Sequence, residues 1–121
     1  ATSLVIPEVK GKIDGIAIRV PTPDVSLTEL TVEVEKATSV AEVNAALQAA
    51  SQAGPLKGIL GYSEVELVSS DYIGNAYSCI IDAKNTNVID GTMVKVSGWY
   101  DNEWGYATRC VDLIQLVGAK L

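Results

Sequence analysis

Strict alternation of apolar and polar side chains over residues 26–36 (SLTELTVEVEK) is the feature that most limits what this chain can fold into. Thr28, Leu30, Val32 and Val34 form one set, which is mostly apolar, and the residues between them are mostly polar. Because successive side chains of a strand point to opposite faces, this pattern indicates an antiparallel strand with one solvated face. We therefore expect a sheet that is covered on one side.

A helix is predicted directly after this strand. Ser39 and Glu42 have the spacing of a capping box, in which each side chain bonds the other residue's backbone amide. A Gly–Pro pair at residues 54–55 ends the helix. A single apolar stripe must be buried against another element, so this helix is expected to pack on the sheet. The stripe consists of Val40, Val43, Leu47 and Ala50.

The remaining segments complete an α+β pattern. An opening helix is expected to stop near Pro7, and a long helix is expected from residue 103 to the end, with Asn102 as its candidate N-cap. Asp90 and Gly91 indicate a hairpin. We therefore predict one domain over residues 1–121, with a mixed, mostly antiparallel sheet and helices packed on one face. The further expected strands are residues 15–20, 77–83, 86–90 and 92–100, and residues 59–68 are expected to form a short strand and a turn.

The composition argues against several classes of function. The net charge of −6 and the lack of a Lys/Arg cluster disfavour nucleic acid as a partner, and no apolar run is long enough to span a membrane. The chain has no histidine, which is the commonest metal ligand and general base, so no metal site is expected. Cys79 and Cys110 are too far apart for a zinc motif, and we expect free thiols that pack as small apolar residues.

Residues 99–109 (WYDNEWGYATR) hold both tryptophans of the chain in a polar stretch. Asn102 is placed where a strand leads into a helix, a position at which free backbone amides often meet a ligand. Its side chain carries both a donor and an acceptor, which suits recognition of another amide. The alternative is that Asn102 only caps the helix while Trp99 and Trp104 only contribute packing.

Arg19 is the second candidate binding residue. It occurs inside the apolar segment IAIRVPTP, where an unpaired charge is costly. A guanidinium at the end of a strand can bind a phosphate or a carboxylate. On the residues alone, a structural ion pair with one of the chain's carboxylates is the favoured alternative. No glycine-rich phosphate loop or nucleophile elbow is present, so the residues alone contain no complete catalytic apparatus.

Three segments resemble the C-terminal, catalytic domain of glyceraldehyde-3-phosphate dehydrogenase: AIRVPTPDVSLTELTVEVEK, PLKGILGYSEVELVSSDY and VKVSGWYDNEWGYATRCVDL. The resemblance extends in order over nearly the whole chain. It implies that Arg19 binds a substrate phosphate, that Asn102 contacts the nicotinamide carboxamide, and that Tyr106 borders the nicotinamide. It also implies that Tyr100 lines the pocket near the reactive sulfur. NAD or NADP would be the cofactor, and a triose phosphate and inorganic phosphate would be the substrates.

The same resemblance implies that parts of that enzyme are missing here. Its N-terminal dinucleotide-binding domain, the segment with its nucleophilic cysteine and its activating histidine have no counterpart in this chain. We therefore expect a fragment that begins at Ala1, has no catalytic residue of its own and shows no turnover alone. The resemblance further implies a homo-oligomer formed through the sheet face, in the cytoplasm or the plastid stroma, with a role in glycolysis or the Calvin cycle.

Two alternatives stay open at this point. The chain can be a non-catalytic assembly or interaction module that uses the same fold. It can also derive from an erythrose-4-phosphate dehydrogenase, because enzymes of that kind share these motifs.

Overall fold

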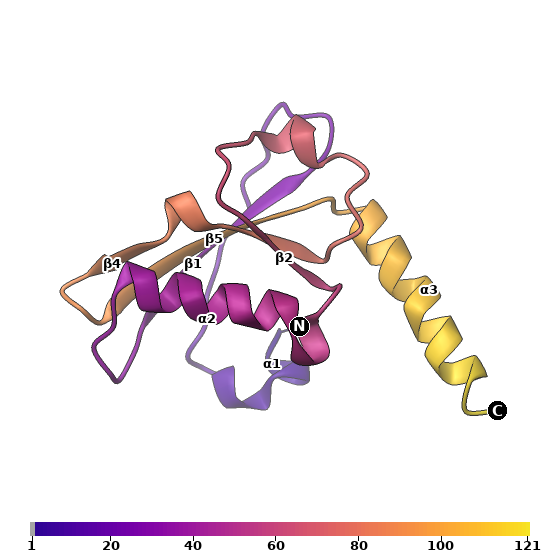
Figure 1. Ribbon diagram of the computed structural model, residues 1–121, viewed down its shortest axis with the longest axis horizontal. Helices are drawn as coiled ribbons and strands as arrows, with labels where there is room; N and C mark the ends of the chain where they lie inside the picture. The colour runs from indigo at the N-terminus through magenta and orange to yellow at the C-terminus, as the bar shows by residue number, and fades with distance from the viewer. Residues whose placement is uncertain (1) are drawn as a thin grey trace.

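Strand β5 (Met93–Tyr100) is the central strand of the sheet in the computed structural model, which describes residues 2–121 (Figure 1). The strand order is β1-β5-β3-β2, and β4 also pairs with β5. Strand β2 is parallel to β3, whereas every other pairing is antiparallel. The predicted α+β class with a mixed, mostly antiparallel sheet is therefore confirmed.

The regular elements agree with most of the predicted segments. The other strands are β1 (Ser26–Glu33), β2 (Leu60–Ser63), β3 (Cys79–Asp82) and β4 (Asn87–Ile89). The α-helices are α1 (Thr2–Val5), α2 (Val40–Gln52) and α3 (Trp104–Gly118). Four 3-10 turns occur at η1 (Pro7–Val9), η2 (Gly54–Leu56), η3 (Ser69–Tyr72) and η4 (Ala83–Asn85).

The alternating segment forms an antiparallel strand, as predicted. Strand β1 pairs with β5 from Ser26 opposite Tyr100 to Glu33 opposite Met93. Its apolar face is less covered than we expected, because Leu30 and Val32 remain 41% and 36% exposed. Strand β1 lies at the edge of the sheet, and a groove of about 700 Å³ separates α2 from Val94 and Val96 of the neighbouring β5.

Helix α2 starts with the predicted capping box. The amide of Glu42 donates to the hydroxyl oxygen of Ser39 at 3.3 Å, and the amide of Ser39 donates to the Glu42 carboxylate at 2.9 Å. Asn44 then donates to the carbonyl of Ala83 at 3.0 Å, which ties the helix to the turn after β3. The predicted hairpin is also present, since Asp90 joins β4 to β5 with a positive φ of 51°.

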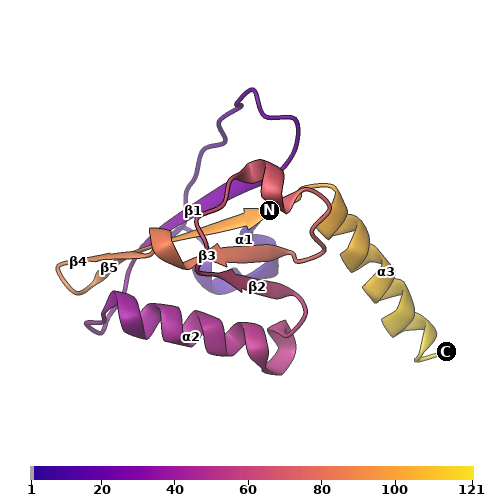
Figure 2. The same ribbon diagram turned by 45° about the horizontal axis from the view of Figure 1, so that its top comes forward.

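The strand predicted at residues 15–20 is wrong. These residues form no regular element and are all exposed, with Ile16 at 88% and Ile18 at 75%. A β-rich composition makes a strand only where a neighbouring strand supplies hydrogen bonds, and none pairs with this segment within residues 2–121. In both views the segment loops out beyond the start of β1 (Figures 1 and 2).

The loop enters β1 through Val25, which is buried and has a φ of +71°. This left-handed conformation is a true outlier for a β-branched residue. The carboxylate of Asp24 accepts the Val25 amide at 2.7 Å, so the unusual backbone is held in place by the preceding side chain.

The main core cluster contains a stacked aromatic pair. The rings of Tyr72 and Trp99 are 5.7 Å apart with an interplanar angle of 18°, and Val25 and Ile80 pack with them. The indole nitrogen of Trp99 donates to the buried carboxylate of Asp82 at 3.1 Å. Trp99 is therefore partly buried against the core, and the polar atom of its side chain is satisfied.

Helix α3 extends away from the sheet, whereas α2 runs alongside it (Figure 2). Gly105 is the one buried residue of α3, and the helix leaves most of its apolar side chains in solvent. Within residues 2–121, no helix is both long enough and apolar enough to cross a bilayer. The exposed apolar residues of α3 include Val111, Leu113, Ile114, Leu116 and Val117.

Gly98 provides a test of packing between β5 and β3. A methyl group at this position would overlap the Sγ atom of Cys79. We expect Gly98→Ala to lower the free energy of unfolding by about 1–3 kcal/mol through overpacking. Urea titration of the variant, alone and together with Cys79→Ala, measures the coupling. An equal loss in both backgrounds would show that Cys79 is not the obstacle.

Candidate functional site

The corner between β5 and α3 carries the predicted amide. Strand β5 ends at Tyr100, directly opposite Ser26 of β1, and α3 begins at Trp104. Asn102 is exposed in the connecting turn, and its Oδ1 accepts the Ser26 hydroxyl at 3.4 Å. This contact uses the acceptor of the amide and leaves Nδ2 as a donor that faces no protein acceptor within residues 2–121.

The prediction that Asn102 caps α3 is wrong: Glu103 occupies the N-cap position without a side-chain cap bond, and the Asp101 side chain accepts the first free amides in place of Asn102. Oδ1 of Asp101 accepts the amides of Trp104 at 2.8 Å and Glu103 at 3.0 Å. Both Asp and Asn are favoured at a helix N-cap, so the adjacent pair in the sequence did not reveal which side chain would turn inward. Since Asp101 takes this role, Asn102 is released from it.

The second oxygen of Asp101 makes a long-range contact. Oδ2 accepts the amide of Gly74 at 2.8 Å, and the residue is only 3% exposed. The amides of Trp104 and Gly74 hold the pKa of the Asp101 carboxyl below its usual value, and the side chain of Asp24 contributes as well. The carboxylate is thus a fixed, charged acceptor beneath the corner.

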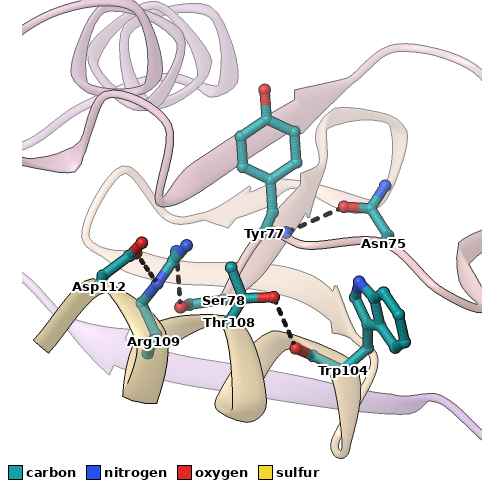
Figure 3. Close-up of polar contacts among 7 residues, drawn as sticks. All are labelled: Asn75, Tyr77, Ser78, Trp104, Thr108, Arg109 and Asp112. Atoms are coloured by element: carbon teal, nitrogen blue, oxygen red, sulfur yellow. Dashed lines mark hydrogen bonds and ion pairs between the residues drawn. The ribbon is translucent and has the colours of Figure 1, made fainter. Parts of the chain in front are cut away.

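Residues 75–78 pack against the first turns of α3 (Figure 3). Arg109 donates to the hydroxyl oxygen of Ser78 at 3.4 Å, and its Nε atom lies 2.7 Å from the carboxylate of Asp112. A Cβ atom on Gly105 would come within 2.9 Å of the carbonyl oxygen of Tyr77. Only glycine therefore allows the start of α3 to approach this segment so closely.

Tyr106 is located in the first turn of α3 and is 73% exposed. A side-chain hydrogen bond with Cys110, one turn further along the helix, raises the pKa of the Tyr106 phenol. Tyr100 is half-buried at the end of β5. Tyr100, Asn102 and Tyr106 thus follow one another along the chain across the β5–α3 corner.

Arg19 is placed differently, in the irregular and exposed segment that precedes β1. The ion pairs within residues 2–121 join Lys95 to Glu29 and Arg109 to Asp112, so Arg19 is not used in a structural ion pair there. This outcome removes the structural alternative considered for its charge. Its role as a phosphate ligand stays a prediction.

The two cysteines are free, as predicted, but they are half-buried and not fully buried. Burial raises the pKa of the Cys79 thiol, which disfavours the reactive thiolate. No group of three His, Cys, Asp or Glu side chains in residues 2–121 is arranged to hold a metal ion. The groups at the corner can hydrogen-bond and orient a ligand.

Comparison with known proteins assigns the family. Residues 1–102 match the family model described as glyceraldehyde 3-phosphate dehydrogenase, C-terminal domain. The chain belongs to this family. The matched region ends at Asn102, so α3 lies beyond it.

Several relatives are similar over α3 as well. A glyceraldehyde-3-phosphate dehydrogenase 2 from Trichormus variabilis is 58% identical over 120 residues, which is 99% of this chain and 35% of that protein. The glyceraldehyde-3-phosphate dehydrogenase from Geobacillus stearothermophilus is also 58% identical, over 99% of this chain and 36% of its own length. The Streptomyces coelicolor protein of the same name is 53% identical over 121 residues, 36% of its length. The chain thus spans about a third of these relatives.

The low pKa of Asp101 gives a signed pH dependence. Because the pKa of Asp101 is lower in the folded chain than in the unfolded chain, its carboxylate stabilises the fold at pH values above the unfolded pKa of about 3.9. This contribution is lost as the pH falls through the lower, folded pKa. We expect Asp101→Asn to cost about 1–3 kcal/mol at pH 7 and progressively less in acid. Urea unfolding at pH 7 and pH 3 measures the difference. Glu8→Gln is the exposed control, and a cost for Asp101→Asn that stayed constant with pH would contradict the assignment.

Proposed function

We propose that this chain is the C-terminal part of a phosphorylating, NAD(P)-dependent glyceraldehyde-3-phosphate dehydrogenase. In this role it contributes contacts to the nicotinamide and to the substrate phosphate. The observation that carries the proposal is the Asn102 amide, which is exposed at the β5–α3 corner with its oxygen bonded to Ser26 and its nitrogen available. Membership of the family and 58% identity to two dehydrogenases support it.

The donor set at the corner fits a nicotinamide. The ligand's carboxamide offers a carbonyl acceptor, and Nδ2 of Asn102 is a matching planar donor. Tyr106 and Tyr100 would border the ring and limit the access of water to it. When bound, the cofactor would supply the hydride acceptor, while the residues of this chain would fix the orientation of its ring.

Arg19 would bind the phosphate of the substrate. Its guanidinium is exposed and is not engaged in an ion pair within residues 2–121, so it can form a charge-assisted pair with a phosphate oxygen. The nucleophilic cysteine and the histidine base would come from the rest of the subunit. This division predicts that the residues of this chain bind and position the ligands, and that the rest of the subunit supplies the groups that make and break bonds.

A second candidate function is assembly without catalysis. The partly exposed apolar residues Leu30 and Val32 on β1 favour it, because an open apolar sheet face is suited to a second copy of the chain. In the dehydrogenase proposal the same face would form the subunit interface of a homo-oligomer. A triose phosphate and an erythrose phosphate are both compatible with the residues present.

The length of the native polypeptide separates the two functions. We expect the native polypeptide to have an intact mass about three times that of this chain, because the chain spans 35–36% of its relatives. We also expect the 121-residue chain to form no NADH from glyceraldehyde 3-phosphate, NAD and phosphate. A native polypeptide of 121 residues would favour the assembly module. Measurable NADH formation by the purified chain would show that it holds catalytic groups of its own.

Two substitutions in a full-length subunit should have opposite specificity. Arg19→Ala removes a charged hydrogen bond and should raise KM for the triose phosphate by roughly 10-fold to 100-fold, with KM for the cofactor unchanged. Asn102→Ala should raise KM for the cofactor and leave KM for the triose phosphate unchanged. Steady-state kinetics with each substrate varied in turn measures both, and Lys12→Ala provides the exposed cationic control. Equal effects of Arg19→Ala and Lys12→Ala would remove the phosphate contact from the proposal.

A further inference from the structure

Asp101 makes one more contact than a helix cap requires. Its Oδ1 accepts the two amides at the start of α3, which completes the cap. Its Oδ2 is bonded to the amide of Gly74, in a segment 27 positions earlier in the chain. The same carboxylate therefore joins the β5–α3 corner to the loop that follows η3.

That loop is attached to the corner at further points. On one side of Gly74, Tyr72 stacks on Trp99 of β5 with 5.7 Å between ring centroids. On the other side, the backbone of Tyr77 lies against Gly105, and Ser78 accepts a hydrogen bond from Arg109. Residues 72–78, which we call the backing loop, thus support the last residues of β5 and the first turns of α3 (Figure 3).

Asn102 depends on this support because little else holds it. Its side chain is exposed, and the Ser26 contact at 3.4 Å is long for a hydrogen bond to a hydroxyl. The backbone of residues 101–103 therefore fixes where the Asn102 side chain leaves the main chain, and so limits the directions that its amide can take. Asp101 holds that backbone through three part-buried hydrogen bonds of 2.8–3.0 Å.

We propose that Asp101 is a positioning residue that anchors the turn carrying Asn102 to Gly74 of the backing loop and so directs the Asn102 amide. The inference rests on the proposed function for its purpose, since Asn102 is the residue assigned to the nicotinamide. Its structural content can be measured without cofactor. A purely capping Asp101 would need only the two amides of α3, and the Gly74 bond would then be irrelevant to Asn102.

Asp101→Ser separates the two roles. Serine is a good N-cap, so α3 should keep its helical content, but its single short hydroxyl cannot also reach Gly74. In the 121-residue chain labelled with ¹⁵N, we expect exchange of the Gly74 amide proton to accelerate by at least about tenfold. The side-chain amide signals of Asn102 should move toward the positions of a freely rotating asparagine.

Asp71→Asn is the matched control. Asp71 is also a carboxylate that accepts a backbone amide, that of Val68 at 2.8 Å, but this bond stays within its own turn. It should leave the Asn102 signals unchanged. Unaltered Gly74 exchange and Asn102 signals in Asp101→Ser would overturn the proposal. Where Asp101→Ser lowers stability too far, Asp101→Asn serves instead. Its one oxygen can accept the two amides of α3, and its NH₂ group then replaces Oδ2 and cannot accept from Gly74.

Kinetics of the full-length subunit distinguish a failure of this inference from a failure of the proposed function. Asp101→Ser should raise KM for the nicotinamide cofactor by severalfold with kcat largely retained, whereas Asp71→Asn should change neither. Altered Asn102 signals together with an unchanged cofactor KM would keep the anchoring and overturn the nicotinamide role. If the Asn102 signals stay unchanged in Asp101→Ser while Asn102→Ala raises KM for the cofactor, the nicotinamide role is kept and the anchoring by Asp101 is overturned.

Discussion

Pairing of β1 along the whole of β5 is the interaction on which the rest of the structure depends. The register runs from Ser26 opposite Tyr100 to Glu33 opposite Met93, and the other edge of β5 receives β3 and β4. A shift by one residue would turn every side chain to the opposite face of the sheet. The register therefore decides that Trp99 enters the core and that the turn carrying the candidate amide begins beside Ser26.

Local signals in the sequence predicted most of the regular elements. The alternation over residues 26–36 and the capping box of Ser39 and Glu42 depend only on neighbouring residues, and the structure contains both. Residues 15–20 have the same β-rich character, yet they form no strand. A strand needs a partner edge as well as suitable side chains, and a single segment of sequence carries no information about that edge.

The candidate site was predictable in part. The strand-to-helix transition predicted for residues 100–104 is present, since β5 ends at Tyr100 and α3 begins at Trp104. The binding roles of Tyr100, Asn102 and Tyr106 there stay predictions. The choice between Asp101 and Asn102 as the cap was not predictable, because it depends on the amide of Gly74, which the fold brings in from a distant segment. The ligand roles came from family resemblance, and the position of Arg19 outside the regular elements leaves its role to experiment.

The left-handed backbone of Val25 has a consequence for the loop before it. Such a conformation costs about 1–3 kcal/mol in a non-glycine residue, and burial together with the Asp24 contact offsets it. This local conformation restricts how the chain enters β1, and Pro21 and Pro23 restrict the backbone just before it. Arg19 is thus carried on a short segment of restricted flexibility, so binding of an anion by Arg19 would cost little conformational entropy.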